Sequence, residues 1–408
     1  MTKQELLEAH RRLELFLGSL LPLTGRLERR RWGSFYVQGL LLEGGRKSAA
    51  QMAQRYGGDV QALQQFVNQS PWDWYPIRHR LALKMSDALG KDRPAWPLDD
   101  TGFPKKGEHS VGVARQYSGT LGKVANCQIG VSLNYATDDG CVPIDFELYL
   151  PEEWAWVPER RAKAGIPEEI KYRTKPEIAL AMIDRAISWG VTPGVVCADA
   201  AYGNSGDFRA ELVKRGLTYM LAVKGNTVVR TEEGQVQAVE ELAAGLPSGA
   251  WAEVCWREGT KGKLKANFAA LRVFPKHEEQ ALWLLVQAPQ KEGEDWKYWF
   301  SNLPPQTSLL ELVRYAKIRW WVEQNYQQLK DELGLDHFEG RSWTGWHHHV
   351  TLVMMAFDFL VLERLRSKKN FWVWFDPPAS EGGDPDRPIA PLGLLPHMWD
   401  KDSWPYLT

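Results

Sequence analysis

The chain has 408 residues, of which 44% are hydrophobic and 25% charged, and its formal net charge is −1. These ordinary globular values exclude a fibrous or largely disordered protein, and the length predicts about two or three domains of roughly 150 residues each. The charge also excludes a uniformly basic surface, although local basic patches can still bind nucleic acid.

The cysteines and the apolar segments indicate the cellular compartment of the protein. Four cysteines lie far apart without a C-x-x-C pair, which argues against a disulfide scaffold or zinc ribbon and is typical of the reducing cytoplasm. The longest apolar run, 350–362, contains Asp358 and is shorter than the roughly 20 residues that a membrane-spanning helix needs. We therefore expect a cytoplasmic protein, with this run as a buried helix and Asp358 paired with an arginine or a helix cap.

Residues 1–93 predict a helical domain, because helix formers dominate between glycine and proline breaks. The segment carries 15 Lys and Arg against 9 Asp and Glu, so it is basic. Two short helical patterns, 48–56 and 60–67, flank Gly57-Gly58, which is typical of a helix-turn-helix. We expect a DNA-binding domain, with a plain helical bundle as the alternative.

The pattern changes to alternating strands and helices over 94–225. The predicted strands are 96–100, 124–135, 141–150, 195–199 and 217–224, and the predicted helices are 176–189 and 205–215. Three strands followed by helix, strand, helix and strand predict an α/β domain with a mixed sheet.

Three further segments complete the chain. Residues 226–304 alternate in strand fashion and predict a β-rich insertion, and helices return over 305–370, at 308–333 and 346–365. The tail, 371–408, is rich in proline and aspartate, and we expect a poorly structured arm.

Three acidic residues stand out by their context. Asp100 and Asp199 each end an apolar strand, and Glu323 lies in the helix of RWWVEQNYQQLK. Carboxylates at strand ends of an open sheet gather at one crevice. Converging carboxylates suit Mg²⁺, and two such ions can clamp the attacking and leaving oxygens of a phosphoryl transfer.

The helix around Glu323 supplies a second signal. At about 100° per residue, a stripe roughly 80° wide carries two tyrosines, two cations and this carboxylate. Its members are Tyr315, Arg319, Glu323, Tyr326 and Lys330. Cations beside a metal-binding carboxylate suit a site that grips phosphates, whereas the alternative is a solvated face with ordinary i,i+4 pairing.

The blocks 99–133 (from DDTGF), 197–203 (CADAAYG) and 319–352 (from RWWVEQN) together resemble the bacterial insertion-sequence transposases of the DDE type. The resemblance covers roughly residues 30–365. It implies an RNase H-like catalytic core interrupted by the β-rich insertion. It also implies that Asp100, Asp199 and Glu323 are the catalytic triad and hold two Mg²⁺ ions, with Mn²⁺ as a substitute, and that Asp99 is the alternative to Asp100.

Related transposases carry a Tyr-x2-Arg-x3-Glu-x6-Lys signature. Arg319, Glu323 and Lys330 match its spacing, whereas Tyr315 lies one residue too early and Ala316 occupies the expected place. The resemblance therefore leaves the role of Tyr315 open.

Basic and aromatic residues near these blocks are candidate DNA contacts. A glycine-rich stretch after Asp100 carries four of them, and the others lie near the second and third acids or in the insertion. The set is Lys105, Lys106, Arg115, Lys123, Lys224, Arg319, Tyr326, Lys330 and Trp299. The alternative for the lysines is solvated turn charge. For Trp299, and for Trp296, which could stack a flipped base, the alternative is a buried strand aromatic.

His347-His348-His349 does not predict a metal site, because consecutive helical residues point about 100° apart and ligands on a helix want i,i+4 spacing. We expect a structural or DNA-facing role for them. Arg341, Ser342 and Trp343 just before them are weaker candidates for DNA contact.

The hypothesis that unites these features is a transposase acting by metal-dependent phosphoryl transfer. Its partners would be double-stranded DNA, as terminal inverted repeats and as target, and a second copy in a homodimer. One alternative is a transposase-derived DNA-binding regulator that no longer cuts. Another is a small-substrate or structural-RNA nuclease on the same core, which would cut DNA without preference for repeat ends.

Overall fold

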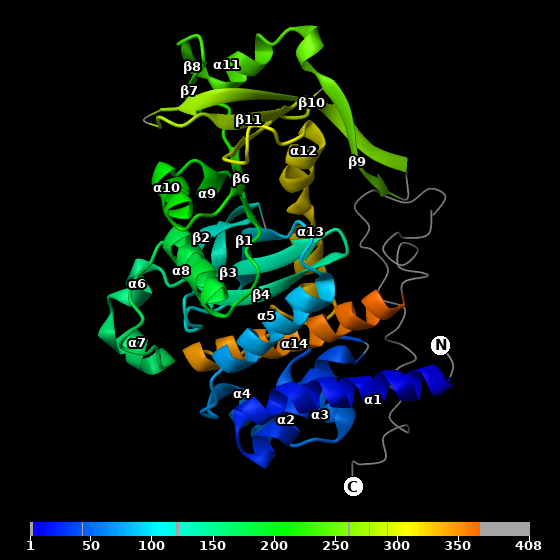
Figure 1. Ribbon diagram of the computed structural model, residues 1–408. Helices are drawn as coiled ribbons and strands as arrows, with labels where there is room; N and C mark the ends of the chain where they lie inside the picture. Colours follow the sequence, from blue (N-terminus) through cyan, green and yellow to red (C-terminus); the bar gives the residue numbers. More distant parts are fainter. Residues whose placement is uncertain are drawn as a thin grey trace.

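The computed structural model describes residues 3–42, 44–119, 122–259, 262–276, 278–291 and 293–367. The predicted tail, 371–408, lies outside the described residues. The protein is a mixed α/β structure in which one large sheet runs through the molecule, with helices at its flanks and at one end (Figure 1). The α/β class predicted from the strand and helix pattern is confirmed.

Five helices form the N-terminal segment, as the sequence predicts. They are α1 (Lys3–Leu20), α2 (Leu27–Leu41), α3 (Ala49–Tyr56), α4 (Val60–Asn68) and α5 (Tyr75–Leu89). Ser48 caps α3 and Asp59 caps α4 with their side-chain oxygens. Gly57 ends α3 in the left-handed region at φ 76°, a conformation that glycine adopts without steric cost.

Six strands build the core of the sheet. They are β1 (Ala95–Pro104), β2 (Ala114–Ser118), β3 (Lys123–Thr137), β4 (Gly140–Leu148), β5 (Val195–Ala198) and β6 (Tyr219–Val223). β1 pairs antiparallel with β3 and parallel with β5, and β5 pairs parallel with β6, so the sheet is mixed. The predicted end of the first strand at Asp100 is wrong: β1 continues to Pro104 because its second half still pairs with β3.

Helices flank this sheet. After β4 come α6 (Glu152–Ala155), α7 (Pro158–Ala164), α8 (Lys175–Ser188), α9 (Ala200–Gly203) and α10 (Gly206–Lys214). In Figure 1, α8 and α10 lie on one side of β1 and β6, and α12 (Leu309–Ile318) and α13 (Trp320–Asp331) lie on the other. The single helix predicted over 308–333 is interrupted at Arg319, so the expected stripe of side chains spans two helices.

The β-rich insertion extends the core sheet. Its elements are β7 (Val228–Arg230), β8 (Val236–Ala238), α11 (Val239–Ala244), β9 (Ala252–Gly259), β10 (Gly262–Pro275), β11 (Leu282–Gln287) and β12 (Lys297–Ser301). β12 pairs antiparallel with β6, which gives the strand order β2-β3-β1-β5-β6-β12-β11-β10-β7-β8. The insertion is therefore hydrogen-bonded to the strand that follows Asp199 in the chain.

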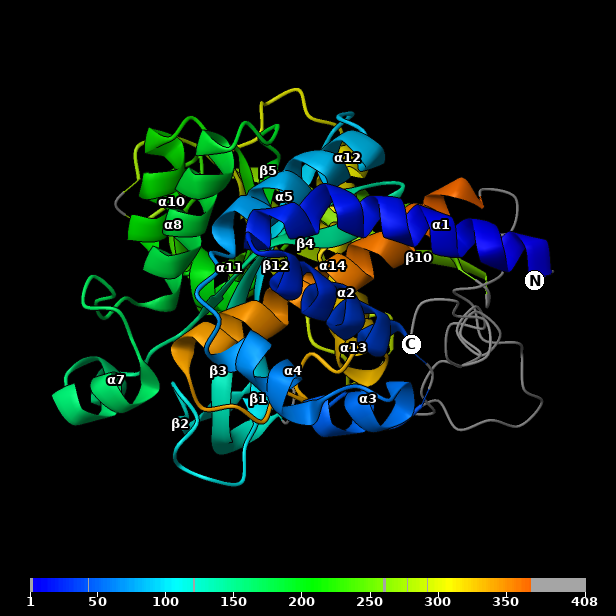
Figure 2. The ribbon, with the colours of Figure 1, turned by 90° about the horizontal axis from the view of Figure 1, so that it is seen from below.

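The long helix α14 (Trp343–Arg366) joins the N-terminal helices to the sheet. It contacts β4 on one side and α2, α4 and α5 on others, and α1 and α2 cross it in Figure 2. Burial on several sides explains its nearly continuous apolar sequence. Among the described helices, none combines the length and apolarity that crossing a bilayer requires.

Candidate active site

The pairing of β1 with β5 brings two of the predicted acids together. Parallel register places Pro97 beside Cys197, so Asp99 and Asp199, each two residues further along, reach the same level. β5 ends at Ala198, and Asp199 begins α9 as its N-cap by accepting a hydrogen bond from the backbone N–H of Ala201 at 2.9 Å. The carboxylate is thereby fixed where the strand turns into the helix.

Three carboxylates meet at this point. Each of Asp99, Asp100 and Asp199 offers an oxygen atom, and these oxygens lie within 4.8 Å of one another. Asp99 is buried, and burial together with the neighbouring carboxylates raises its pKa to about 7, against the opposing effect of Arg319. The cluster is thus an acidic site in which like charges crowd at the edge of the protein interior.

Glu323 is connected to this cluster through an arginine. Arg319 donates one hydrogen bond to Asp99 at 2.8 Å and another to Glu323 at 3.0 Å. The Glu323 side chain is 56% exposed, whereas that of Asp99 is 11% exposed. The structure therefore brings Asp100 and Asp199 together with Asp99, whereas Glu323 is connected to this cluster through Arg319, which lies between it and the buried Asp99.

Lys175 is a member of the site that sequence reasoning missed. Its ammonium forms an ion pair with Asp100 at 2.5 Å from the first turn of α8. Thr174 and Glu177 form a capping box there, which locks the start of the helix. The T-x-x-E spacing was the available signal for this helix start, but it did not reveal that Lys175 faces Asp100.

Three predicted residues of α12 and α13, Tyr315, Tyr326 and Lys330, are buried. The hydroxyl groups of Tyr326 and Ser132 are hydrogen-bonded at 2.6 Å, and Lys330 donates to the carbonyl of Gly102 on β1 at 2.9 Å. Burial lowers the pKa of Lys330 to about 8. In this structure these groups hold β1 and β3 against the helices, and their contact with DNA stays a prediction.

The other predicted DNA contacts divide into exposed and engaged side chains. Lys106, Arg115, Lys123 and Lys224 are exposed. Lys105 instead donates to the carbonyl of Phe338 at 2.7 Å.

The two tryptophan candidates of the insertion also differ in how exposed they are. Trp299 is buried in β12, with the ammonium of Lys317 5.1 Å from its ring centre. The structure thus supports the alternative to DNA contact for Trp299, which is a buried aromatic residue within a strand. Trp296 is 37% exposed beside Trp251.

The three histidines are structural, as expected. All are fully buried on α14: His347 stacks on Trp74, His348 stacks on Trp72, and the hydroxyl of Tyr36 is hydrogen-bonded to His349. Burial lowers the pKa of His348 to about 4 and that of His349 to about 3, so both are neutral at pH 7.

Comparison with known proteins defines the class first. A family model described as "DDE superfamily endonuclease" matches residues 19–241, and one described as "Transposase DDE domain" matches residues 173–359. A protein from Microchaete diplosiphon, the "Probable transposase for insertion sequence element IS701", is 30% identical over 300 residues, 72% of each chain. The chain therefore belongs to the DDE transposases of insertion-sequence elements, as its three sequence blocks predicted.

Proposed function

We propose that this transposase cuts and rejoins DNA at the terminal inverted repeats of its insertion sequence by metal-dependent phosphoryl transfer. The observation that carries the proposal is the convergence of carboxylate oxygens of Asp99, Asp100 and Asp199 within 4.8 Å, with Glu323 linked to Asp99 through Arg319. A mixed sheet with helices on both sides supports an RNase H-like core around them.

The acidic cluster fits divalent metal ions. Hard cations such as Mg²⁺ take carboxylate oxygens, and a crowded acidic site gains by accepting positive charge. Asp100, Asp199 and Glu323 would hold two Mg²⁺ ions, or Mn²⁺ in their place, with Asp99 as the alternative first acid. When bound, such ions supply a nucleophile and charge stabilisation for the attacking and leaving oxygens.

The proposal assigns a separate role to each of the two cations beside the cluster, Arg319 and Lys175. Arg319 neutralises Asp99 and Glu323 in the structure described here. If the carboxylates were bound to a cation instead, the Arg319 guanidinium would be available to hold a phosphate in bidentate fashion. Lys175, paired with Asp100, positions that carboxylate.

DNA would be held over a wide surface. We propose that the domain 1–93 binds the inverted repeats and that the exposed Lys106, Arg115, Lys123 and Lys224 contact the phosphate backbone. A homodimer would bring the two ends of the element together on the bacterial nucleoid. A regulator that only binds DNA is the second candidate, but the clustering of Asp99, Asp100 and Asp199 supports the enzyme.

Replacing Glu323 tests the proposal directly. Glu323→Gln should lower strand cleavage by more than about a hundredfold, because losing a metal ligand should cost more than the 10- to 100-fold typical of the groups around one. The side chain is exposed, so folding and end binding should be preserved. Cleavage would be followed on a duplex carrying the DNA that borders the gene, and undiminished cleavage by this variant in Mg²⁺ would refute the assignment.

A further inference from the structure

The helix α4 presents an unusual exposed face. Leu63, Phe66 and Val67 are buried, whereas amide side chains occupy the opposite face at i, i+3, i+4 and i+7 spacing. These amides are Gln61, Gln64, Gln65 and Asn68, of which the glutamines are exposed. A surface helix usually presents charged residues to water, so a face made of amides alone needs an explanation.

The position of α4 matches that of a base-reading helix. It follows α3 after the short turn at Gly57-Gly58, and the turn is fixed: a Cβ at Gly58 would lie 2.4 Å from the ring of Phe35. In a helix-turn-helix, the second helix enters the major groove and its side chains reach the base edges.

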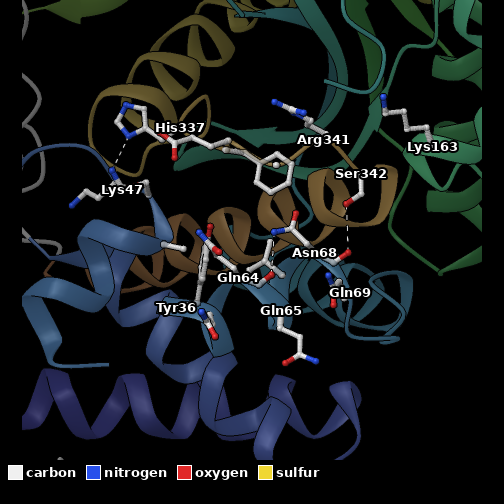
Figure 3. Close-up of a pocket in the computed structure, with 17 residues that line it drawn as sticks. Tyr36, Lys47, Gln64, Gln65, Asn68, Gln69, Lys163, His337, Arg341 and Ser342 are labelled. Atoms are coloured by element: carbon white, nitrogen blue, oxygen red, sulfur yellow. Dashed lines mark hydrogen bonds between the residues drawn. The ribbon is translucent and has the colours of Figure 1, made fainter. Parts of the chain in front are cut away.

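The amide face borders a hollow of about 660 Å³. The segment 337–342, which follows α13, forms the other side, and Figure 3 shows Arg341 and Ser342 across from Gln64 and Asn68. Arg341 and Lys163 at this hollow are exposed cations. The acid that lines it, Glu339, is ion-paired with Arg46 at 2.9 Å. The hollow therefore combines uncharged amides with an excess of positive charge.

We propose that α4 reads the base edges of duplex DNA in the major groove through Gln61, Gln64 and Gln65, while Arg341 and Lys163 contact the adjoining phosphates. The inference rests on the proposed function, because it names the surface that would recognise the inverted repeats. Glutamine and asparagine pair in bidentate fashion with adenine, whereas arginine and lysine carry the charge that attracts phosphates. Recognition of the bases and binding of the phosphate backbone are thus assigned to different side chains.

Two hydrogen bonds connect the amide face of α4 and the segment 337–342 to the catalytic part of the chain. Ser342 donates to the backbone carbonyl of Asn68, and Lys105, from the loop after β1, donates to the carbonyl of Phe338. Gly340 leaves no room for a side chain, because a Cβ there would lie 2.3 Å from the Asn68 side-chain oxygen. DNA read by α4 would therefore be held in a defined position relative to β1, which carries Asp99 and Asp100.

The test compares binding to two duplexes by the full chain. One contains the DNA bordering the gene and the other is a scrambled sequence of equal length. The triple variant Gln61→Ala, Gln64→Ala, Gln65→Ala should lose roughly ten- to a hundredfold of its preference for the bordering DNA, with unchanged affinity for the scrambled duplex. Arg341→Gln should weaken both and reduce the salt slope by about one. Gln306→Ala, at an exposed amide before α12, is the matched control and should change neither.

The outcomes separate this inference from the proposed function. If the wild-type protein prefers the bordering DNA and the triple variant keeps that preference, α4 does not read the ends, although the transposase proposal stands. If the wild-type protein shows no preference, both fail. If the triple variant changes the oligomeric state measured by light scattering while DNA preference is intact, the amide face is a protein interface and the inference is overturned.

Discussion

At the scale of single residues, Asp358 departs from expectation. It was expected to pair with an arginine or a cap, but it is fully buried on α14, and within the part of the chain that the structure describes neither carboxylate oxygen has a hydrogen-bond partner. Burial raises its pKa well above the usual value, which favours the protonated form in the folded protein. Sequence could not reveal this, because helical spacing says nothing about which partner reaches a buried side chain.

Asp358→Asn should stabilise the protein increasingly as the pH rises. An aspartate whose folded pKa is raised favours folding only at low pH. Above its unfolded pKa of about 3.9, it costs up to about 1.4 kcal/mol per pH unit until the folded pKa is reached. The gain in free energy of unfolding should therefore be larger at pH 8 than at pH 5, as measured by urea denaturation. An equal loss at both values would mean that the carboxylate has a stabilising partner.

At the scale of elements, the strands and helices that carry the site follow local patterns and were predictable. The strands through Asp99 and up to Asp199, the helix with Glu323 and the four strands β9 to β12 of the insertion appear where the alternation and helical periodicity place them, whereas the short strands β7 and β8 were not predicted. The extension of β1, the strand β2 and the break at Arg319 were missed, because they depend on pairing and packing between distant segments. Lys175 escaped notice for the same reason.

Gly203 shows how closely the helix α9 approaches the sheet. A Cβ at Gly203 would lie 1.9 Å from the backbone oxygen of Ala222 on β6, so Gly203→Ala must push α9 away from the sheet. We expect a loss of about 1–3 kcal/mol in the free energy of unfolding, as for other overpacked sites, and reduced cleavage because Asp199 begins α9. Gly206→Ala is the control, since its nearest neighbour is an arginine tip at 3.7 Å. Equal stability of the two variants would contradict this account.

At the scale of the whole molecule, a buried ionic network joins the N-terminal helices to the sheet. Asp145 on β4 accepts from Arg78 of α5 at 3.1 Å and from Arg185 of α8 at 2.7 Å. Arg185 also donates to Glu147 at 2.6 Å, and Glu147 accepts from Tyr75 at 2.9 Å. Three elements far apart in sequence thus depend on a charge network in which Arg78 and Asp145 are fully buried and Arg185 is partly buried.

Asp145→Asn should be strongly destabilising, by about 3–5 kcal/mol, because it leaves the buried guanidinium of Arg78 and the partly buried one of Arg185 partly uncompensated. Urea denaturation would measure the loss, and hydrogen exchange should show α5 opening more readily. Asp138→Asn is the matched control: Asp138 pairs with Arg314 at the surface, and exposed pairs contribute at most about 1 kcal/mol. Similar effects of the two substitutions would show that the network does not hold the parts together.

The most direct test of the central claim maps cleavage of the DNA that borders the gene. The full chain would be incubated with that DNA in Mg²⁺ and in Mn²⁺, beside the variant Asp199→Asn, and the cut ends sequenced. The account predicts cuts at inverted repeats that depend on the metal and disappear in the variant. Cuts that persist in the variant, or end binding without cleavage in either metal, would contradict it.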